Sequence, residues 1–141
     1  MKTLTKLFVA IAVILLIASC GNKDNKQAKK VDAVEVSVDS LLRDASALEG
    51  LTVRFKAKVD HACMHGGKRL TVYGSIDGKT MKIDGTEKSP KFVSSLMGKT
   101  VEVTGIVRKV AGSHVADCEA EEGNEIPEVA YIIECIDYSE I

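Results

Sequence analysis

The chain has 141 residues, of which 45% are hydrophobic and 28% charged, with 19 lysines and arginines against 20 aspartates and glutamates. This balance is typical of one globular domain and excludes an intrinsically disordered chain. Aromatic residues make up only 4% and tryptophan is absent. That scarcity argues against a surface on which nucleic-acid bases stack.

The first twenty residues have the layout of a secretory signal. Lys2 and Lys6 provide a basic start, and an unbroken apolar run follows over residues 7–17. At 1.5 Å per residue this run would span about 16 Å, roughly half of a bilayer core, which is too short for a transmembrane helix. The pattern therefore predicts a signal peptide over residues 1–19.

The signal ends in Ile17-Ala18-Ser19-Cys20, which resembles the lipobox of bacterial lipoproteins. The resemblance implies cleavage before Cys20, diacylation of its sulfur and usually acylation of the new amino group. Two or three acyl chains make a stable membrane anchor. We therefore expect the acylated Cys20 to bind a lipid bilayer in a bacterial cell envelope, with the domain facing the periplasm or the exterior. An ordinary secretory signal with a coincidental cysteine is the alternative.

The charged residues divide the mature chain into a tether and an acidic domain. Residues 20–36 comprise the lipidated cysteine and a polar, lysine-rich segment typical of a flexible tether, and residues 37–141 form the predicted domain. Residues 31–141 carry 13 basic and 19 acidic side chains, a net charge of −6. Because neutralisation of phosphates by lysine and arginine dominates nucleic-acid binding, no nucleic-acid partner is expected.

Hydrophobic periodicity predicts one helix followed by three strands. Apolar residues at helical spacing indicate a short amphipathic helix over 39–49 that ends at Gly50. From residue 51 to 59 the odd positions are apolar and the even ones polar, which predicts a half-buried strand. The pair Asp77-Gly78 is a hairpin signal between a second strand over 70–76 and a third over 81–83.

A second helix and two more strands complete the predicted domain. Ser89 and Pro90 have the residue types of a helix N-cap and first helical position, and Gly98 would end that helix. Apolar alternation predicts a fourth strand over 101–107 and a fifth over 129–135, joined by a long polar loop over 111–127.

The resulting order β-β-β-α-β-β is that of the OB-fold, a five-stranded Greek-key barrel. The predicted fold class is therefore mainly β, a five-stranded OB-fold barrel with a short N-terminal helix. Through Leu41-Leu42, Leu48-Glu49-Gly50 and residues 61–68, the chain also resembles the small OB-fold lipoproteins grouped with anticodon-binding-like OB domains. Most of those lipoproteins have no assigned activity, so the resemblance implies a fold and little chemistry.

Histidines and cysteines concentrate at the two loops that bind ligands in OB-folds. His61, Cys63 and His65 follow the first strand at alternate positions, and the odd-numbered register would continue its inward face. His114 and Cys118 fall in the loop between the fourth and fifth strands.

Three interpretations of these residues compete. They could bind Zn or Cu through His61, Cys63 and His65, with Cys118 or His114 completing the ligand set. Two of the three mature cysteines could instead form a disulfide, and Cys63–Cys118 would join the two loops, whereas Cys135 fits the core better. Finally, His61 and Cys63 could simply pack on the inner face of the strand.

The leading functional hypothesis is a membrane-anchored, non-enzymatic OB-fold binding module. An envelope protein or a small ligand would bind between the two loops, with Gly66, Gly67, Lys68 and His114 as candidate contacts. No catalytic residue is assigned, because the Cys–His pair lacks an evident third residue to orient the imidazole. The first alternative is a metal-handling or redox-handling envelope protein that uses the His61-x-Cys63-x-His65 cluster, and the second is a structural subunit of an envelope complex.

Overall fold

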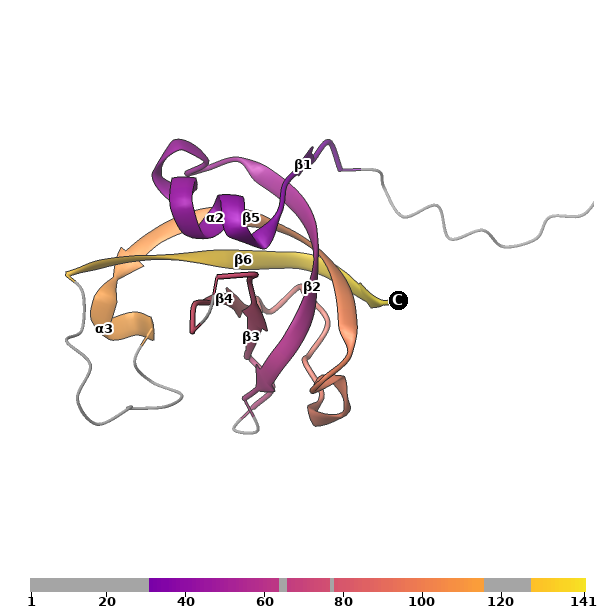
Figure 1. Ribbon diagram of the computed structural model, residues 1–141. Coiled ribbons are helices and arrows are strands. Elements are labelled where there is room, and N and C mark those ends of the chain that lie inside the picture. Colours follow the sequence, from indigo (N-terminus) through magenta and orange to yellow (C-terminus); the bar gives the residue numbers. More distant parts are fainter. Residues whose placement is uncertain (1–30, 64–65, 77, 116–127) are drawn as a thin grey trace, which may run out of the picture. The chain divides into compact units, whose positions relative to one another are not determined.

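The computed structural model describes residues 31–63, 66–76, 78–115 and 128–141, all of which lie in one compact unit from Val31 to Ile141. Figure 1 shows the ribbon. The elements, with η for a 3-10 turn, are β1 (Val34–Glu35), α2 (Val38–Asp44), η1 (Ala45–Ala47), β2 (Thr52–Ala62), β3 (Arg69–Tyr73), β4 (Thr80–Asp84), η2 (Ser94–Leu96), β5 (Thr100–Ala111), α3 (Gly112–Val115) and β6 (Val129–Glu140). No helix among the described residues is long and apolar enough to cross a membrane.

Five strands close into a barrel. The sheet order is β1-β2-β3-β4-β6-β5, and an additional pairing of β2 with β5 completes the ring. Within the ring only β4 and β6 run parallel, and Ile83↔Ile133 and Asp84↔Glu134 are their registered pairs. This mainly β barrel with a short helix confirms the predicted OB-fold class.

Helix α2 packs against the barrel and contributes to its core. The side chain of Ser37 accepts a hydrogen bond from the backbone N of Ser40 at 3.1 Å, which caps the start of the helix. Leu41 is completely buried. The helix is shorter than the predicted 39–49, because the chain tightens into η1 after Asp44.

Strand β2 does not keep its alternation to its end. The register with β3 shifts between Val59 and His61, and beyond this β-bulge Ala62 is buried with 1% exposure while His61 is only half-buried. A bulge adds one residue to a strand and moves the following side chains to the opposite face. The prediction that His61 and Cys63 continue the inward face is therefore wrong.

The predicted second helix is also wrong, since only the 3-10 turn η2 forms there. The hydroxyl of Ser89 accepts a hydrogen bond from the backbone N of Thr86 at 2.7 Å, so it caps a local turn and not a following helix. The backbone N of Phe92 donates to the carbonyl of Gly67 at 3.0 Å. Because this donor is used in a long-range contact, the segment stays extended up to Val93.

Cys135 lies in the barrel core, as the sequence predicts for this cysteine. Burial, assisted by the negative charge of Asp137, raises the pKa of the Cys135 thiol to about 12.

We expect iodoacetamide to leave Cys135 unmodified in the folded protein and to alkylate it in urea, as measured by peptide mass mapping, because only the thiolate reacts. Equal alkylation rates in both conditions would contradict this assignment.

Candidate functional site

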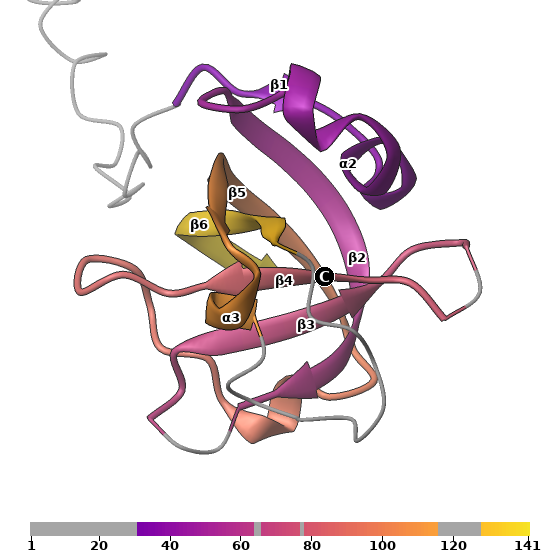
Figure 2. The same ribbon diagram turned by 90° about the vertical axis from the view of Figure 1, so that its left-hand side faces the viewer.

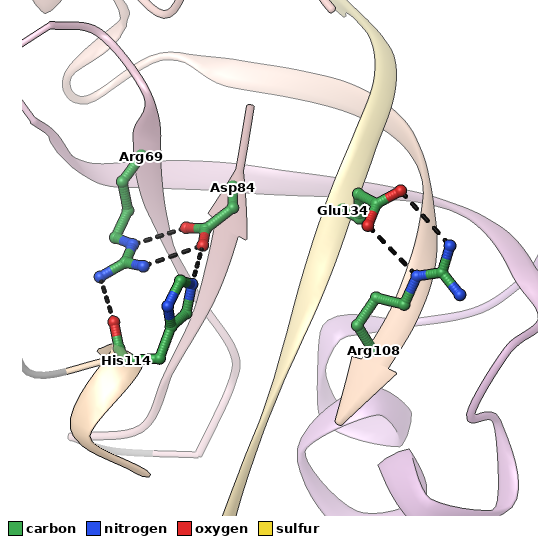
Figure 3. A network of polar contacts seen from close by, with 5 residues as sticks. All are labelled: Arg69, Asp84, Arg108, His114 and Glu134. Carbon is green, nitrogen blue, oxygen red and sulfur yellow. Dashed lines mark hydrogen bonds and ion pairs between the residues drawn. The ribbon is translucent and has the colours of Figure 1, made fainter. Parts of the chain in front are cut away.

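Three side chains from distant parts of the chain meet at one end of β3 and β4 (Figure 3). Arg69 begins β3, Asp84 ends β4, and His114 lies in α3. The Arg69 guanidinium donates to both carboxylate oxygens of Asp84, from Nε at 2.5 Å and from Nη2 at 2.8 Å. Its Nη1 donates to the carbonyl oxygen of His114 at 2.9 Å, and the Nε2 of His114 lies 2.7 Å from Oδ2 of Asp84.

Burial makes this network energetically important. Arg69, at 7% exposure, is the only charged residue that is buried in the described part of the chain. A buried charge is tolerated only when it is paired and hydrogen-bonded. Burial by itself would raise the pKa of Asp84, but its hydrogen bonds with Arg69 and His114 outweigh that effect and hold the pKa below its ordinary value of 3.8. Asp84 is therefore ionised at neutral pH.

A row of four charged side chains continues from this network across the barrel, with the two acidic residues in the middle and an arginine at each end. Asp84 is in register with Arg69 on one side and with Glu134 of β6 on the other. Glu134 in turn accepts a hydrogen bond from Nε of Arg108 in β5 at 3.2 Å, as Figure 3 shows. The row thus joins four strands and spans the short parallel pair β4–β6.

The loop that precedes β3 is held through its backbone. The carbonyl of Gly67 accepts from Phe92, the carbonyl of Lys68 accepts from Gly85 at 2.6 Å, and the carbonyl of Arg69 accepts from Cys63 at 2.9 Å. Gly66 and Gly67 both have positive φ angles, +96° and +62°, a conformation that favours glycine. These contacts fix the end of the first predicted binding loop against the segment 85–92.

Beside the network lies an open depression of about 580 Å³. Its lining residues are Val110, Ala111, Ser113 and His114. The His114 side chain is 48% exposed, so water reaches an imidazole whose position is fixed by Asp84. The depression is open to solvent and combines apolar side chains with a hydroxyl and an imidazole.

The structure brings together some of the predicted site residues. Through its backbone Arg69 contacts Cys63, and through its side chain it contacts His114, so it links the edges of both predicted loops. His61 lies apart on β2, in register with Thr71 of β3. No group of three His, Cys, Asp or Glu residues suited to a metal ion occurs within residues 31–63, 66–76, 78–115 and 128–141.

Three other predicted residues lie outside the described parts of the chain. They are Cys20, His65 and Cys118. The lipid anchor, the full Zn or Cu ligand set and the Cys63–Cys118 disulfide therefore remain predictions.

Neither Arg69 nor Asp84 is among the site residues predicted above, although the sequence carries a signal for the pair. The two strands beside Asp77-Gly78 carry opposite charges at their outer ends, and the structure pairs these residues directly. If Asp77-Gly78 formed a two-residue turn, β3 and β4 would pair in a different register. In the structure Tyr73↔Thr80 is the last pair of the two strands, and a longer connection follows it. The pairing becomes visible only when the length of that connection is known.

Comparisons with known proteins support the fold and nothing more specific. No protein-family model and no curated protein matches the chain. A putative aspartyl-tRNA synthetase from Leishmania major Friedlin superposes with a TM-score of 0.50 at 12% identity, over 82% of this chain and 22% of that one. The Est3 telomerase subunit of the yeast Hansenula polymorpha gives a TM-score of 0.46 at 12% identity, over 87% of this chain and 80% of its own. This chain thus spans less than a quarter of the synthetase, and the likeness shows a common fold alone.

Proposed function

We propose that the chain is a membrane-anchored lipoprotein of a bacterial envelope whose OB-fold barrel is a non-enzymatic binding module. The lipobox that ends at Cys20 supports the anchor. The binding role rests on one observation: Arg69 ties the edges of both predicted loops to the same end of the barrel.

The position of this network matches the part of the OB-fold that binds ligands. OB-folds bind through their second and third strands and through the loops between strands one and two and between strands four and five. Here those strands are β3 and β4, and α3 begins the second of those loops. Because Arg69 and Asp84 hold the loop edges in place before any ligand arrives, binding costs less conformational entropy.

The contacts of His114 hold α3 against the network. The Nε2 of His114 lies against Asp84 and its carbonyl accepts from Arg69, so both contacts serve to position α3. The net charge of −6 over residues 31–141 favours an envelope protein or a small ligand over a polyanion.

Site-directed photo-crosslinking in the producing bacterium tests the binding role. A photoreactive side chain at position 113, in the depression, is compared with one at position 102, near the opposite end of β5. We expect a discrete crosslinked product from position 113 that is absent from position 102 and is lost when Asp84→Asn is added. Equal crosslinking at both positions would contradict the site, as would a product that is insensitive to Asp84→Asn.

The lipid anchor gives a separate prediction. Cys20→Ser is expected to abolish incorporation of radiolabelled palmitate and to stop signal cleavage before residue 20, because no thiol remains to be acylated. Cys135→Ser is the control, since that cysteine is buried in the core. Labelling that persists in Cys20→Ser would rule out the lipoprotein assignment.

A further inference from the structure

Two exposed apolar side chains flank the 3-10 turn η2. Val93 and Met97 are 50% and 46% exposed. The residues beside them, Phe92 and Leu96, are buried in the barrel core. The backbone N of Met97 donates to the carbonyl of Ser94 at 3.2 Å, which closes the turn. Buried neighbours and a closed turn thus hold the two apolar side chains on the outside of the barrel.

The segment that carries this apolar pair is basic, although the domain is acidic. Residues 85–99 contain three lysines and one glutamate, a net charge of +2, whereas residues 31–141 have a net charge of −6. The lysines, all exposed, are Lys88, Lys91 and Lys99. Lys99 pairs with Glu140 at 2.7 Å on the surface, and an exposed pair of this kind costs little to separate. Val93, Met97 and these three lysines are called the η2 patch below.

The η2 patch lies within reach of the predicted lipid anchor. The backbone N of Gly98 donates to the carbonyl of Val59 at 3.0 Å, so the turn lies beside that residue of β2. Strand β1 pairs with β2 at Val53, six residues earlier, which is about 20 Å along the strand. Figure 2 shows β1 beside one end of β2 and η2, in salmon, toward the other end. Residues 20–33, if fully extended, would cover up to about 46 Å, more than twice that separation.

We infer that the η2 patch is a membrane-docking surface, which contacts anionic headgroups of the bilayer that holds the acylated Cys20. The inference rests on the lipid anchor of the proposed function and goes beyond it, since it assigns the face that the domain turns toward the membrane. Val93 and Met97 enter the headgroup region, where exposed apolar surface is removed from water.

Charge complementarity selects this face of the domain. Lysine side chains lay their apolar stems along the interface while their ammonium groups pair with lipid phosphates. The acidic remainder of the domain is repelled by the same headgroups. A protein partner would instead need several aromatic or arginine anchors in one patch, and neither residue type is exposed in residues 85–99.

Quenching of a fluorescent side chain by brominated lipids tests this inference on the full-length acylated protein. The vesicles contain equal amounts of phosphatidylcholine and phosphatidylglycerol with bromine on the acyl chains, and vesicles without bromine give the reference. A dansyl-bearing side chain is introduced at position 95 in η2 or, for comparison, at position 46 in η1, where the natural serines are both exposed. We expect about twofold quenching at position 95 and none at position 46.

Two double variants identify the side chains responsible. Val93→Ser with Met97→Ser removes the apolar pair and should abolish the quenching at position 95. Val34→Ser with Leu51→Ser is the matched control, because these residues are 50% and 44% exposed and lie at the β1 end of β2. The control should be quenched as the unaltered protein is, and thermal melting establishes that both variants are folded. Vesicles of phosphatidylcholine alone should give weaker quenching, because the lysines lose their anionic partners.

The possible failures point to different conclusions. Palmitate labelling reports acylation independently, so an acylated, vesicle-bound protein that is not quenched at position 95 would overturn the docking surface and leave the proposed function standing. Unchanged quenching after Val93→Ser with Met97→Ser would overturn it as well. A blue shift at position 95 without quenching would show that a protein, such as a second copy of this chain, covers the patch in place of lipid. An unacylated protein that stays in solution would overturn both the anchor and the docking surface.

Discussion

Asp84→Asn is expected to lower the free energy of unfolding by about 3–5 kcal/mol, the usual cost of breaking a buried ion pair by removing one partner. The substitution preserves the size of the side chain but leaves the guanidinium of Arg69, at 7% exposure, without its counter-charge. It also weakens the contact that positions His114. Urea denaturation of the two proteins at pH 7 measures the difference.

The neighbouring pair in the same row provides the control. Arg108 and Glu134 have side-chain exposures of 47% and 40%. Exposed ion pairs contribute about 0–1 kcal/mol, so Glu134→Gln should change stability by no more than that. If Asp84→Asn and Glu134→Gln were equally stable, Arg69 would not depend on Asp84 as the structure indicates.

The contribution of Asp84 should depend on pH in a defined direction. Its pKa in the folded protein lies below the ordinary value of 3.8, so the folded state binds fewer protons than the unfolded state in the interval between the two values. The stabilisation is therefore fully present above about pH 5 and is lost as the pH falls through the folded-state pKa. The stability gap between the unaltered protein and Asp84→Asn should be constant from about pH 6 to 8 and shrink below about pH 4.

Gly67→Ala is expected to destabilise the protein by about 2–4 kcal/mol, for two additive reasons. The residue has a φ of +62°, which disfavours any side chain, and an added Cβ would come within 2.6 Å of the carbonyl oxygen of Phe92. That oxygen belongs to the backbone, so relief requires the 85–92 segment to move. Thermal or urea unfolding of the variant measures the effect.

Gly50→Ala separates the two contributions. Gly50 has a similar φ of +80°, but nothing lies within 4 Å of the Cβ position. Only the conformational cost remains, about 1 kcal/mol. Equal losses in the two variants would show that the contact between Gly67 and Phe92 is unimportant.

Local pattern was sufficient to predict most of the barrel. Alternation of apolar residues from 51 to 59 and from 101 to 107 identified β2 and β5, because a strand with one buried face needs a period of two. The Asp77-Gly78 signal placed the connection between β3 and β4. The same pattern could not show the bulge before His61, since the inserted residue is specified by pairing with β3 and not by composition.

In the candidate site, too, some features could be predicted from local sequence pattern and others depend on pairing between strands. The concentration of histidine and cysteine in two loops directed attention to the end of the barrel at which His114 contacts Asp84 and Arg69. The pairing of Arg69 with Asp84 could not be predicted from the sequence, because these charged residues lie 15 positions apart and their contact depends on the register between β3 and β4.

Sequence alone therefore determined the order of the strands along the chain, the fold class and most of the core residues that the strands contribute, all of which follow from short-range periodicity and from the requirement to bury apolar surface. The apolar residues Leu51, Val93 and Met97, which the sequence also predicts on buried faces, are exposed. It also provides the expectation of a lipid anchor at Cys20. Tertiary structure decided the bulge in β2, the extended path through Phe92 and the pairing of Arg69 with Asp84. Each of these depends on backbone hydrogen bonds or ion pairs between distant segments, whose partners local pattern does not specify.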